Sequence, residues 1–213
     1  MIKIDEDILA TIESIAENTI GYEVYLGGGL CRDVYLGVKP KDIDLFFVPV
    51  ENAPQYLLYD THRNLQYSYR METNETQSLY QRGVEQLIGF KTPSLVVPEL
   101  QFIVYGTTLT AEELTEDMDI GICQIMYHIF SGKFYVSENF KKDVAAKEIR
   151  CYHKYDKYRM IERFDRMQRK FPDFKCVGKP TVGFNDFIES PIEVISSVYR
   201  KIKPRKVSCS SGY

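Results

Sequence analysis

A run of three glycines followed by a pair of aspartates is the part of the sequence that could support chemistry. Gly27, Gly28 and Gly29 follow a short β-type segment and precede a stretch that is compatible with a helix. Glycines let a ligand approach the backbone, and a helix N-terminus offers free N–H groups and the positive end of the helix dipole. This combination predicts a binding site for phosphate groups.

The two aspartates lie at the start of a predicted strand. Asp42 and Asp44 are separated by one residue, and the segment 43–50 that contains the second of them is otherwise apolar. Alternate residues of a strand point to the same side, so we expect both carboxylates on one face. Mg²⁺ or Mn²⁺ would relieve their repulsion, because magnesium prefers oxygen ligands and bridges protein to polyphosphate. Such a site beside bound phosphate is typical of phosphoryl or nucleotidyl transfer.

The order of these features resembles the catalytic head of the poly(A) polymerase and CCA-adding tRNA nucleotidyltransferase family, within the polymerase-β superfamily. The family motif consists of Gly-Gly-x-Val-Arg-Asp, Leu-Leu-Gly and then Asp-x-Asp. The residues of this sequence that match it are Gly28, Gly29, Arg32, Asp33, Leu36, Gly37, Asp42 and Asp44. The alternative is an unrelated α/β domain with a glycine-rich turn and incidental aspartates.

The resemblance implies an α+β fold: a polymerase-β-like nucleotidyltransferase head, with a mixed sheet flanked by helices, and a short helical C-terminal region. It implies that the backbone of Gly28 and Gly29 contacts the triphosphate, and that Arg32 contacts phosphate or braces the aspartate beside it. Asp42 and Asp44 would bind two magnesium ions. One ion would activate the attacking 3′-hydroxyl, and the other would hold the triphosphate and the leaving pyrophosphate.

Weaker similarity to the family continues downstream. The segment 118–124 resembles a degenerate form of the Arg-Arg-Asp-Phe-Thr-Ile-Asn motif, in which Asp119 matches but the arginines and the asparagine are missing. The segment 155–159 is similar to the Glu-Asp-x-x-Arg motif, whose aspartate and arginine recognise the base of the incoming nucleotide in CCA-adding enzymes. The resemblance therefore assigns nucleotide binding to Asp119, Asp156 and Arg159.

The choice of nucleotide follows from the chemistry of Asp156 and Arg159. Residues three apart on a helix point the same way, and a carboxylate accepts hydrogen bonds whereas a guanidinium donates them. Cytosine and adenine both present an amino donor beside a ring-nitrogen acceptor, so the pair predicts ATP or CTP as the substrate. The alternative is that the two side chains only pair with each other on the helix surface.

An amphipathic helix is predicted at 155–171. A basic stripe lies beside its apolar stripe at the same spacing: Arg159, Arg163, Arg166 and Lys170. The stripe predicts contact with a nucleotide or a nucleic acid, and Arg163 joins the candidate nucleotide-binding residues for this reason. The alternative is a solvated helix face.

The charge of the chain is unevenly distributed. Residues 1–120 hold 8 Lys and Arg against 20 Asp and Glu, whereas residues 121–213 hold 19 against 10. The basic half could bind an anionic partner, or the two halves could form two solvated faces of one domain. We predict a catalytic head at residues 1–137, a basic helical region that binds nucleotide or acceptor at 138–199, and a basic tail at 200–213.

Composition narrows the class of protein. The chain has 213 residues, of which 44% are hydrophobic and 27% charged, as is ordinary for a globular protein. No apolar run is long enough to cross a membrane, and the acidic start predicts no secretory signal. The five cysteines form no Cys-x-x-Cys pair, so we expect no zinc site or disulfide framework, and reduced cysteines are typical of the cytoplasm.

Periodicity and turn residues predict the secondary structure. We expect helices at 5–18, 30–36, 118–130, 138–150 and 155–171. We expect strands at 22–26, 43–50, 77–81, 85–91, 100–105 and 134–136.

We therefore predict a magnesium-dependent nucleotidyltransferase that transfers a nucleoside monophosphate from ATP or CTP to a hydroxyl acceptor, with an RNA 3′ end as the expected acceptor. Many members of the superfamily place a third carboxylate on a later strand, where this sequence has Gln101. Its absence favours one alternative, a catalytically silent nucleotide-binding or RNA-binding module on the same fold. The other alternative is nucleotidyl transfer to a small molecule or a protein.

Overall fold

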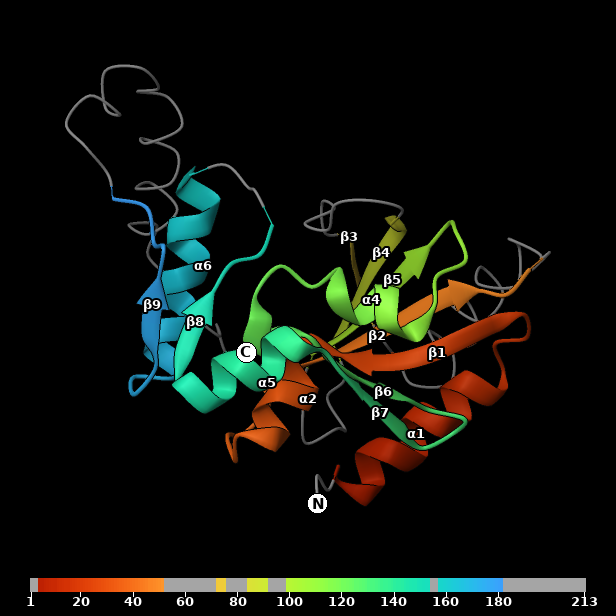
Figure 1. Cartoon of the computed structure of the whole chain (residues 1–213). Coiled ribbons are helices and arrows are strands. Elements are labelled where there is room, and N and C mark those ends of the chain that lie inside the picture. Colours follow the sequence, from red (N-terminus) through yellow and green to blue (C-terminus); the bar gives the residue numbers. More distant parts are fainter. Residues whose placement is uncertain (1–3, 52–71, 76–83, 92–98, 154–156, 182–213) are drawn as a thin grey trace, which may run out of the picture.

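A computed structural model describes residues 4–51, 72–75, 84–91, 99–153 and 157–181. Within these residues a seven-stranded sheet has the order β3-β4-β5-β2-β1-β6-β7, and a separate two-stranded sheet joins β8 to β9 (Figure 1). The strands are β1 (Tyr22–Gly27), β2 (Asp42–Pro49), β3 (Glu72–Glu75), β4 (Val84–Lys91), β5 (Glu99–Tyr105), β6 (Ile125–His128), β7 (Lys133–Val136), β8 (Glu148–Arg150) and β9 (Lys175–Val177).

Helices flank the sheet. They are α1 (Glu6–Glu17), α2 (Gly28–Tyr35), α4 (Ala111–Glu116), the 3₁₀ helix η1 (Gly121–Cys123), α5 (Glu138–Ala146) and α6 (Lys157–Lys170). In the large sheet β2 pairs with β5 in parallel, whereas the other neighbouring strands are antiparallel. The predicted mixed sheet flanked by helices is therefore confirmed. Within the described residues, no helix has the length and apolar character needed to cross a membrane.

Each face of the sheet packs its own apolar core, because side chains alternate along a strand. The first core contains buried residues of α1, α2 and α5 together with these strand residues: Val24, Leu26, Ile43, Leu45, Phe47, Leu100 and Phe102. The second core contains residues of α4, η1 and α6 with the alternate strand residues: Tyr25, Phe46, Val48, Ile103 and Tyr105. Figure 1 shows α1 and α2 on one side of the sheet and α4 on the other.

The alternation places the two aspartates of β2. Asp42 and Asp44 share the strand parity of Phe46 and Val48, so they belong to the face that carries α4 and α6. The predicted one-sided arrangement of the carboxylates is therefore confirmed. Their strand occupies the centre of the sheet between β1 and β5, which fixes the backbone on both sides of the pair.

Several predicted elements are confirmed. Asp5, the first residue of the predicted helix, caps α1 by accepting hydrogen bonds from the N–H groups of Asp7 and Ile8. The second helix, α2, begins at Gly28, two residues before its predicted start. It ends at Tyr35, and Leu36 is its C-cap residue. The strand predicted at 77–81 lies outside the described residues.

The helix predicted at 118–130 is wrong. This segment forms η1 and then β6, whose Tyr127 pairs with Leu26 on β1. Residues from Ile120 to Met126 are all buried, and a short apolar run that is buried on every side does not distinguish a helix from a strand.

The helix predicted at 138–150 is also too long. It ends at Ala146 because Lys147 adopts a left-handed conformation with φ of 51°. Residues Glu148–Arg150 then pair with β9 as β8. No glycine or proline marks this end in the sequence, so the usual stop signal is missing.

Gly27 offers a test of the packing between β1 and the second core. A Cβ added there would lie 2.2 Å from Met126 Sδ and 2.6 Å from Phe46 Cε2, although its φ of −141° suits any residue. Overpacking of a core typically costs about 1–3 kcal/mol. We expect Gly27→Ala to lower the free energy of unfolding by this amount in urea denaturation.

Gly29→Ala is the matched control for this prediction. Its added Cβ would meet no atom closer than 3.2 Å, and alanine favours a helical position. Equal stability of the two variants would contradict the packing argument.

Candidate active site

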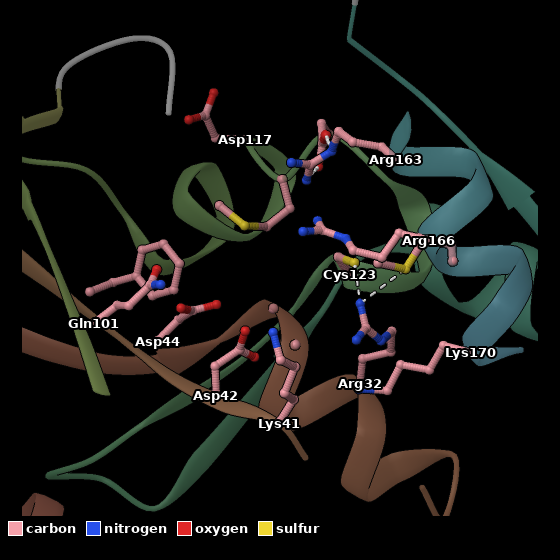
Figure 2. Close-up of a pocket in the computed structure, with 16 residues that line it drawn as sticks. Arg32, Lys41, Asp42, Asp44, Gln101, Asp117, Cys123, Arg163, Arg166 and Lys170 are labelled. Carbon is pink, nitrogen blue, oxygen red and sulfur yellow. Dashed lines mark hydrogen bonds and ion pairs between the residues drawn. The ribbon is translucent and has the colours of Figure 1, made fainter. Parts of the chain in front are cut away.

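A cavity of about 220 Å³ opens where β1 ends and α2 begins (Figure 2). Its lining comes from α2, β2, β5, the segment between α4 and η1, and α6. The predicted site residues that line it are Gly28, Gly29, Arg32, Asp42, Asp44, Asp119 and Arg163. Arg159 is not among the lining residues, and Asp156 lies outside the described residues.

The glycines at the start of α2 bring bare backbone to the two carboxylates. Gly28 has a left-handed φ of 51°, and a Cβ added there would lie 3.8 Å from Asp44 Oδ2. A Cβ on Gly29 would lie 3.2 Å from Asp42 Oδ1 and 3.9 Å from Asp44 Oδ2. Any side chain at these positions would therefore enter the space beside both carboxylates, which is where a cation and a phosphate would have to meet.

The surroundings of the two carboxylates make the ionised form of Asp44 unfavourable. Burial, and after it the charge of Asp42, raises the pKa of Asp44 from 3.8 to about 7, although Arg32, Arg166 and Arg163 act in the opposite direction. The Asp44 carboxyl is therefore only partly ionised at neutral pH, and a nearby divalent cation would favour its charged form.

The donor set fits magnesium. Across the described parts of the chain, no three His, Cys, Asp or Glu residues gather as a metal site. Magnesium is commonly held by one or two carboxylates together with substrate phosphates. Asp42 and Asp44, beside a helix N-terminus that favours phosphate, match that arrangement. The pair alone would bind the ion weakly, so affinity should depend on the nucleotide.

Arg32 is almost completely buried and points along the wall of the cavity. Its Nε and Nη2 lie 2.8 and 2.7 Å from Asp33 Oδ1. Its Nη1 contacts Cys123 Sγ at 3.0 Å and Met167 Sδ at 3.3 Å, and its guanidinium lies 5.1 Å from the centre of the Phe171 ring. Of the two roles implied by the resemblance, the structure shows the brace to Asp33.

Two cations of the predicted basic stripe join α6 to the head. Lys170 forms an ion pair with Asp33, whose side chain is fully buried. Arg163 pairs with Asp119 through two contacts, one of them 2.6 Å from Nη2 to Oδ1. Asp119 and Arg163 are thus brought together at the cavity, and each serves as the counter-ion of the other.

Two residues of the cavity wall, Lys41 and Asp117, were not predicted from the sequence, and Arg166 was predicted only as part of the basic stripe. Lys41 and Arg166 both line the cavity, and neither forms an ion pair with a carboxylate in the ranges that the structure describes. Asp117 lines the far wall, and Gln101 pairs in register with Asp44 across β2 and β5. The position of Lys41 next to Asp42, and of Arg166 in the basic stripe, was a usable signal, whereas nothing local marked Asp117.

The raised pKa of Asp44 gives a pH-dependent prediction. When the pKa of a carboxyl is higher in the folded state than in the unfolded state, the free energy of unfolding of the protein falls as the pH rises. For Asp44 this fall is expected between pH 3.8 and about 7. Asparagine does not ionise, so in EDTA the melting temperature of Asp44→Asn should exceed that of the wild type by more at pH 8 than at pH 4. Differential scanning fluorimetry measures this.

Magnesium provides the control for the same variant. At pH 8 magnesium with a non-hydrolysable triphosphate should raise the melting temperature of the wild type but not of Asp44→Asn. A pH-independent difference between the two proteins would contradict the proposed environment of Asp44.

Solved structures define the class of fold. The CCA-adding enzyme of Thermotoga maritima, complexed with tRNA, matches with 17% identity and a TM-score of 0.57, over 82% of this chain and 40% of that one. A CCA-adding enzyme with CTP matches with 16% identity and a TM-score of 0.57, over 92% and 45%. A tRNA-processing enzyme in its apo form matches with 19% identity and a TM-score of 0.56, over 84% and 46%.

These likenesses confirm that the fold is that of the CCA-adding nucleotidyltransferase head. The chain spans less than half the length of these solved proteins. Residues 3–147 match the Gabija anti-defense 2 family, and the chain belongs to that family. The family that matches is thus an anti-defense family and not the poly(A) polymerases that the sequence motifs resemble. A comparison with curated proteins gives no match.

Proposed function

We propose that the chain is a magnesium-dependent nucleotidyltransferase, which transfers a nucleoside monophosphate from a triphosphate to a hydroxyl acceptor. The observation that carries this proposal is the approach of the α2 N-terminus to the two carboxylates of β2. Bare glycine backbone there lies beside Asp42 and Asp44, within a cavity whose other wall carries Arg163, Arg166 and Lys170 (Figure 2). The positions proposed for the phosphates, for the cation and for the positively charged side chains are thus next to one another.

The roles of the residues follow from their positions. Asp42 and Asp44 would hold magnesium or manganese, which activates a hydroxyl and neutralises the leaving pyrophosphate when bound. The N–H groups of the first turn of α2 would orient the phosphates, and Lys41 and Arg166 would offset their charge. The acceptor oxygen forms a bond to the α-phosphorus, the bond from that phosphorus to pyrophosphate breaks, and the hydroxyl proton is released.

We also propose ATP or CTP as the nucleotide. Arg159, one turn before Arg163 on α6, would donate to the base, with Asp156 as the acceptor. Structures of CCA-adding enzymes with CTP and with ATP support the choice, because those proteins share this fold. The family name adds a biological setting: we propose that the transfer acts against a Gabija defence system.

The acceptor has two candidate classes. An RNA 3′ end is the acceptor predicted from the motifs, and the Thermotoga maritima enzyme in its complex with tRNA supports it by likeness of fold. The family name instead favours a component of a defence system as the target. Both classes supply the hydroxyl that the proposed reaction needs.

A silent binding module remains the second candidate function because of Gln101. This residue pairs in register with Asp44 and lines the cavity, at a place where an acid would complete a three-carboxylate site. A module of this kind would bind triphosphate without transferring it.

Loss of either carboxylate tests the proposed chemistry. With ATP labelled at the α-phosphate, magnesium and total RNA or protein acceptors, Asp42→Asn should lower transfer about a hundredfold or more, because it removes a ligand that stabilises the transition state. Circular dichroism should show an unchanged fold. The exposed Asp173, which lies outside the cavity, provides the matched control Asp173→Asn.

Two outcomes would contradict the activity. Transfer that persists in a variant carrying both Asp42→Asn and Asp44→Asn would place the catalytic centre elsewhere. Triphosphate binding by the wild type with no transfer to any acceptor would support the silent module.

Arg159→Ala tests the choice of nucleotide. If Arg159 donates to the base, the wild type should prefer ATP or CTP over UTP and GTP by roughly tenfold, since an unpaired buried polar group costs ~1–3 kcal/mol. The variant should lose that preference in competition assays with labelled triphosphates. Unchanged selectivity with a slightly lower melting temperature would indicate a surface pair instead.

A further inference from the structure

A serine, a histidine and a glutamate form a chain of hydrogen bonds near the start of β1, whereas the cavity opens at the end of that strand. Ser131 Oγ lies 2.7 Å from His128 Nδ1, and His128 Nε2 lies 2.5 Å from Glu23 Oε2. The described lining of the cavity includes none of the three residues. A hydroxyl beside a base that is itself held by a third group is the usual arrangement of an activated nucleophile.

The pairing of β1 with β6 and the turn after β6 bring these side chains together (Figure 1). Tyr25 on β1 pairs in register with His128 on β6. Glu23 lies two residues before Tyr25, so it shares the same face of the sheet. Ser131 lies in the turn that joins β6 to β7. The contact between Glu23 and His128 therefore follows from strand pairing and not from a local sequence pattern.

The two partners of the imidazole determine where its proton lies. An ionised carboxylate only accepts hydrogen bonds, so Nε2 of His128 must carry the proton that is donated to Glu23. In the neutral ring Nδ1 then carries no proton, and it accepts a hydrogen bond from the Ser131 hydroxyl. This is the tautomer in which His128 can take the serine proton. The negative charge of Glu23 would stabilise the imidazolium that forms.

The ring is held by its neighbours while the hydroxyl stays accessible. The centre of the His128 ring lies 4.8 Å from that of Tyr25 and 5.9 Å from that of Phe130. The His128 side chain is 13% exposed, whereas Ser131 and Gly132 are both exposed residues. Phe130 is 53% exposed and offers an apolar surface next to the histidine. A substrate with an apolar group could thus rest on Phe130 and reach the serine.

We infer that Ser131 is a nucleophile that takes an acyl group from an activated ester with an apolar acyl chain. His128 is its general base, and Glu23 is a positioning residue that acts through His128. The serine oxygen bonds to the carbonyl carbon, and the bond from that carbon to the leaving oxygen breaks. The serine proton passes to Nδ1 of His128 and then to the leaving group. The product is an acylated Ser131, and the reaction is independent of the proposed nucleotidyl transfer.

The ester p-nitrophenyl butyrate tests the reactivity of Ser131. The full chain is treated with it, and mass spectrometry of the peptides measures the rate of butyrylation at each serine. Ser14, which is exposed on α1, is the matched control within the same molecule. We expect Ser131 to react at least about tenfold faster than Ser14, because a positioned general base typically contributes roughly 10²–10⁴-fold.

Variants of the two supporting residues supply the specific readouts. His128→Ala should lower the rate at Ser131 to that at Ser14, and imidazole added to the solution should restore part of it. Glu23→Gln should slow the reaction about tenfold, because an amide that donates to Nε2 favours the tautomer with a proton on Nδ1. Nitrogen NMR of His128 should show this change of tautomer. Asp42→Asn should leave the rate at Ser131 unaltered.

Three results would overturn the inference. A wild-type rate at Ser131 no higher than that at Ser14 would show that the hydroxyl is not activated. An unchanged rate in His128→Ala would remove His128 as the base. A proton on Nδ1 in the wild type would contradict the role of Glu23. None of these results bears on the nucleotidyl transfer, whose test uses other residues and other substrates.

Discussion

The guanidinium of Arg32 is buried between sulfur atoms and an aromatic ring, and a buried cation requires a buried counter-charge. Asp33, itself fully buried, supplies it and also binds Lys170 from α6. Removing one member of such a pair typically costs about 3–5 kcal/mol, because the other charge is left without compensation. The pair lies in the second turn of α2, so it fixes the orientation of the helix whose first turn carries Gly28 and Gly29. The geometry of the site depends on this contact.

Ion pairs between a cation of α6 and a buried aspartate also fix the position of α6 beside the cavity. Arg163 is held by Asp119 and Lys170 by Asp33, and these two cations are about two helical turns apart. Arg166 lies between them on the same face of α6 and lines the cavity. Two of the three cations therefore serve mainly to fix α6. The third, Arg166, forms no ion pair with a carboxylate among the described residues, so its charge is directed at the cavity.

Local sequence patterns were sufficient to predict the arrangement of Asp42 and Asp44 beside the glycines, but they were insufficient to predict the residues that surround them. The glycine run, the strand that follows and the spacing of Asp42 and Asp44 are contiguous in sequence, and the structure places them as expected. The partner of Asp119 is 44 residues away in sequence, and nothing near either residue indicates that Arg163 is its counter-ion. The prediction of a helix at 118–130 was wrong for a related reason. Part of this segment forms the strand β6, which depends on pairing with β1 on one side and β7 on the other.

Gln101 lies in register with Asp44, and its neutral side chain can be explained by the electrostatic repulsion between carboxylates that lie close together. Burial and Asp42 already raise the pKa of Asp44 to about 7, and a third acid at position 101 would add like charge beside a carboxyl that is only partly ionised at neutral pH. Gln101 avoids that repulsion, so the pair is easier to maintain before a ligand arrives. For the proposed magnesium site, the consequence is that the phosphates of a nucleotide would supply the remaining oxygen ligands of the cation. Cation and nucleotide would then bind together, and neither would occupy the site well alone.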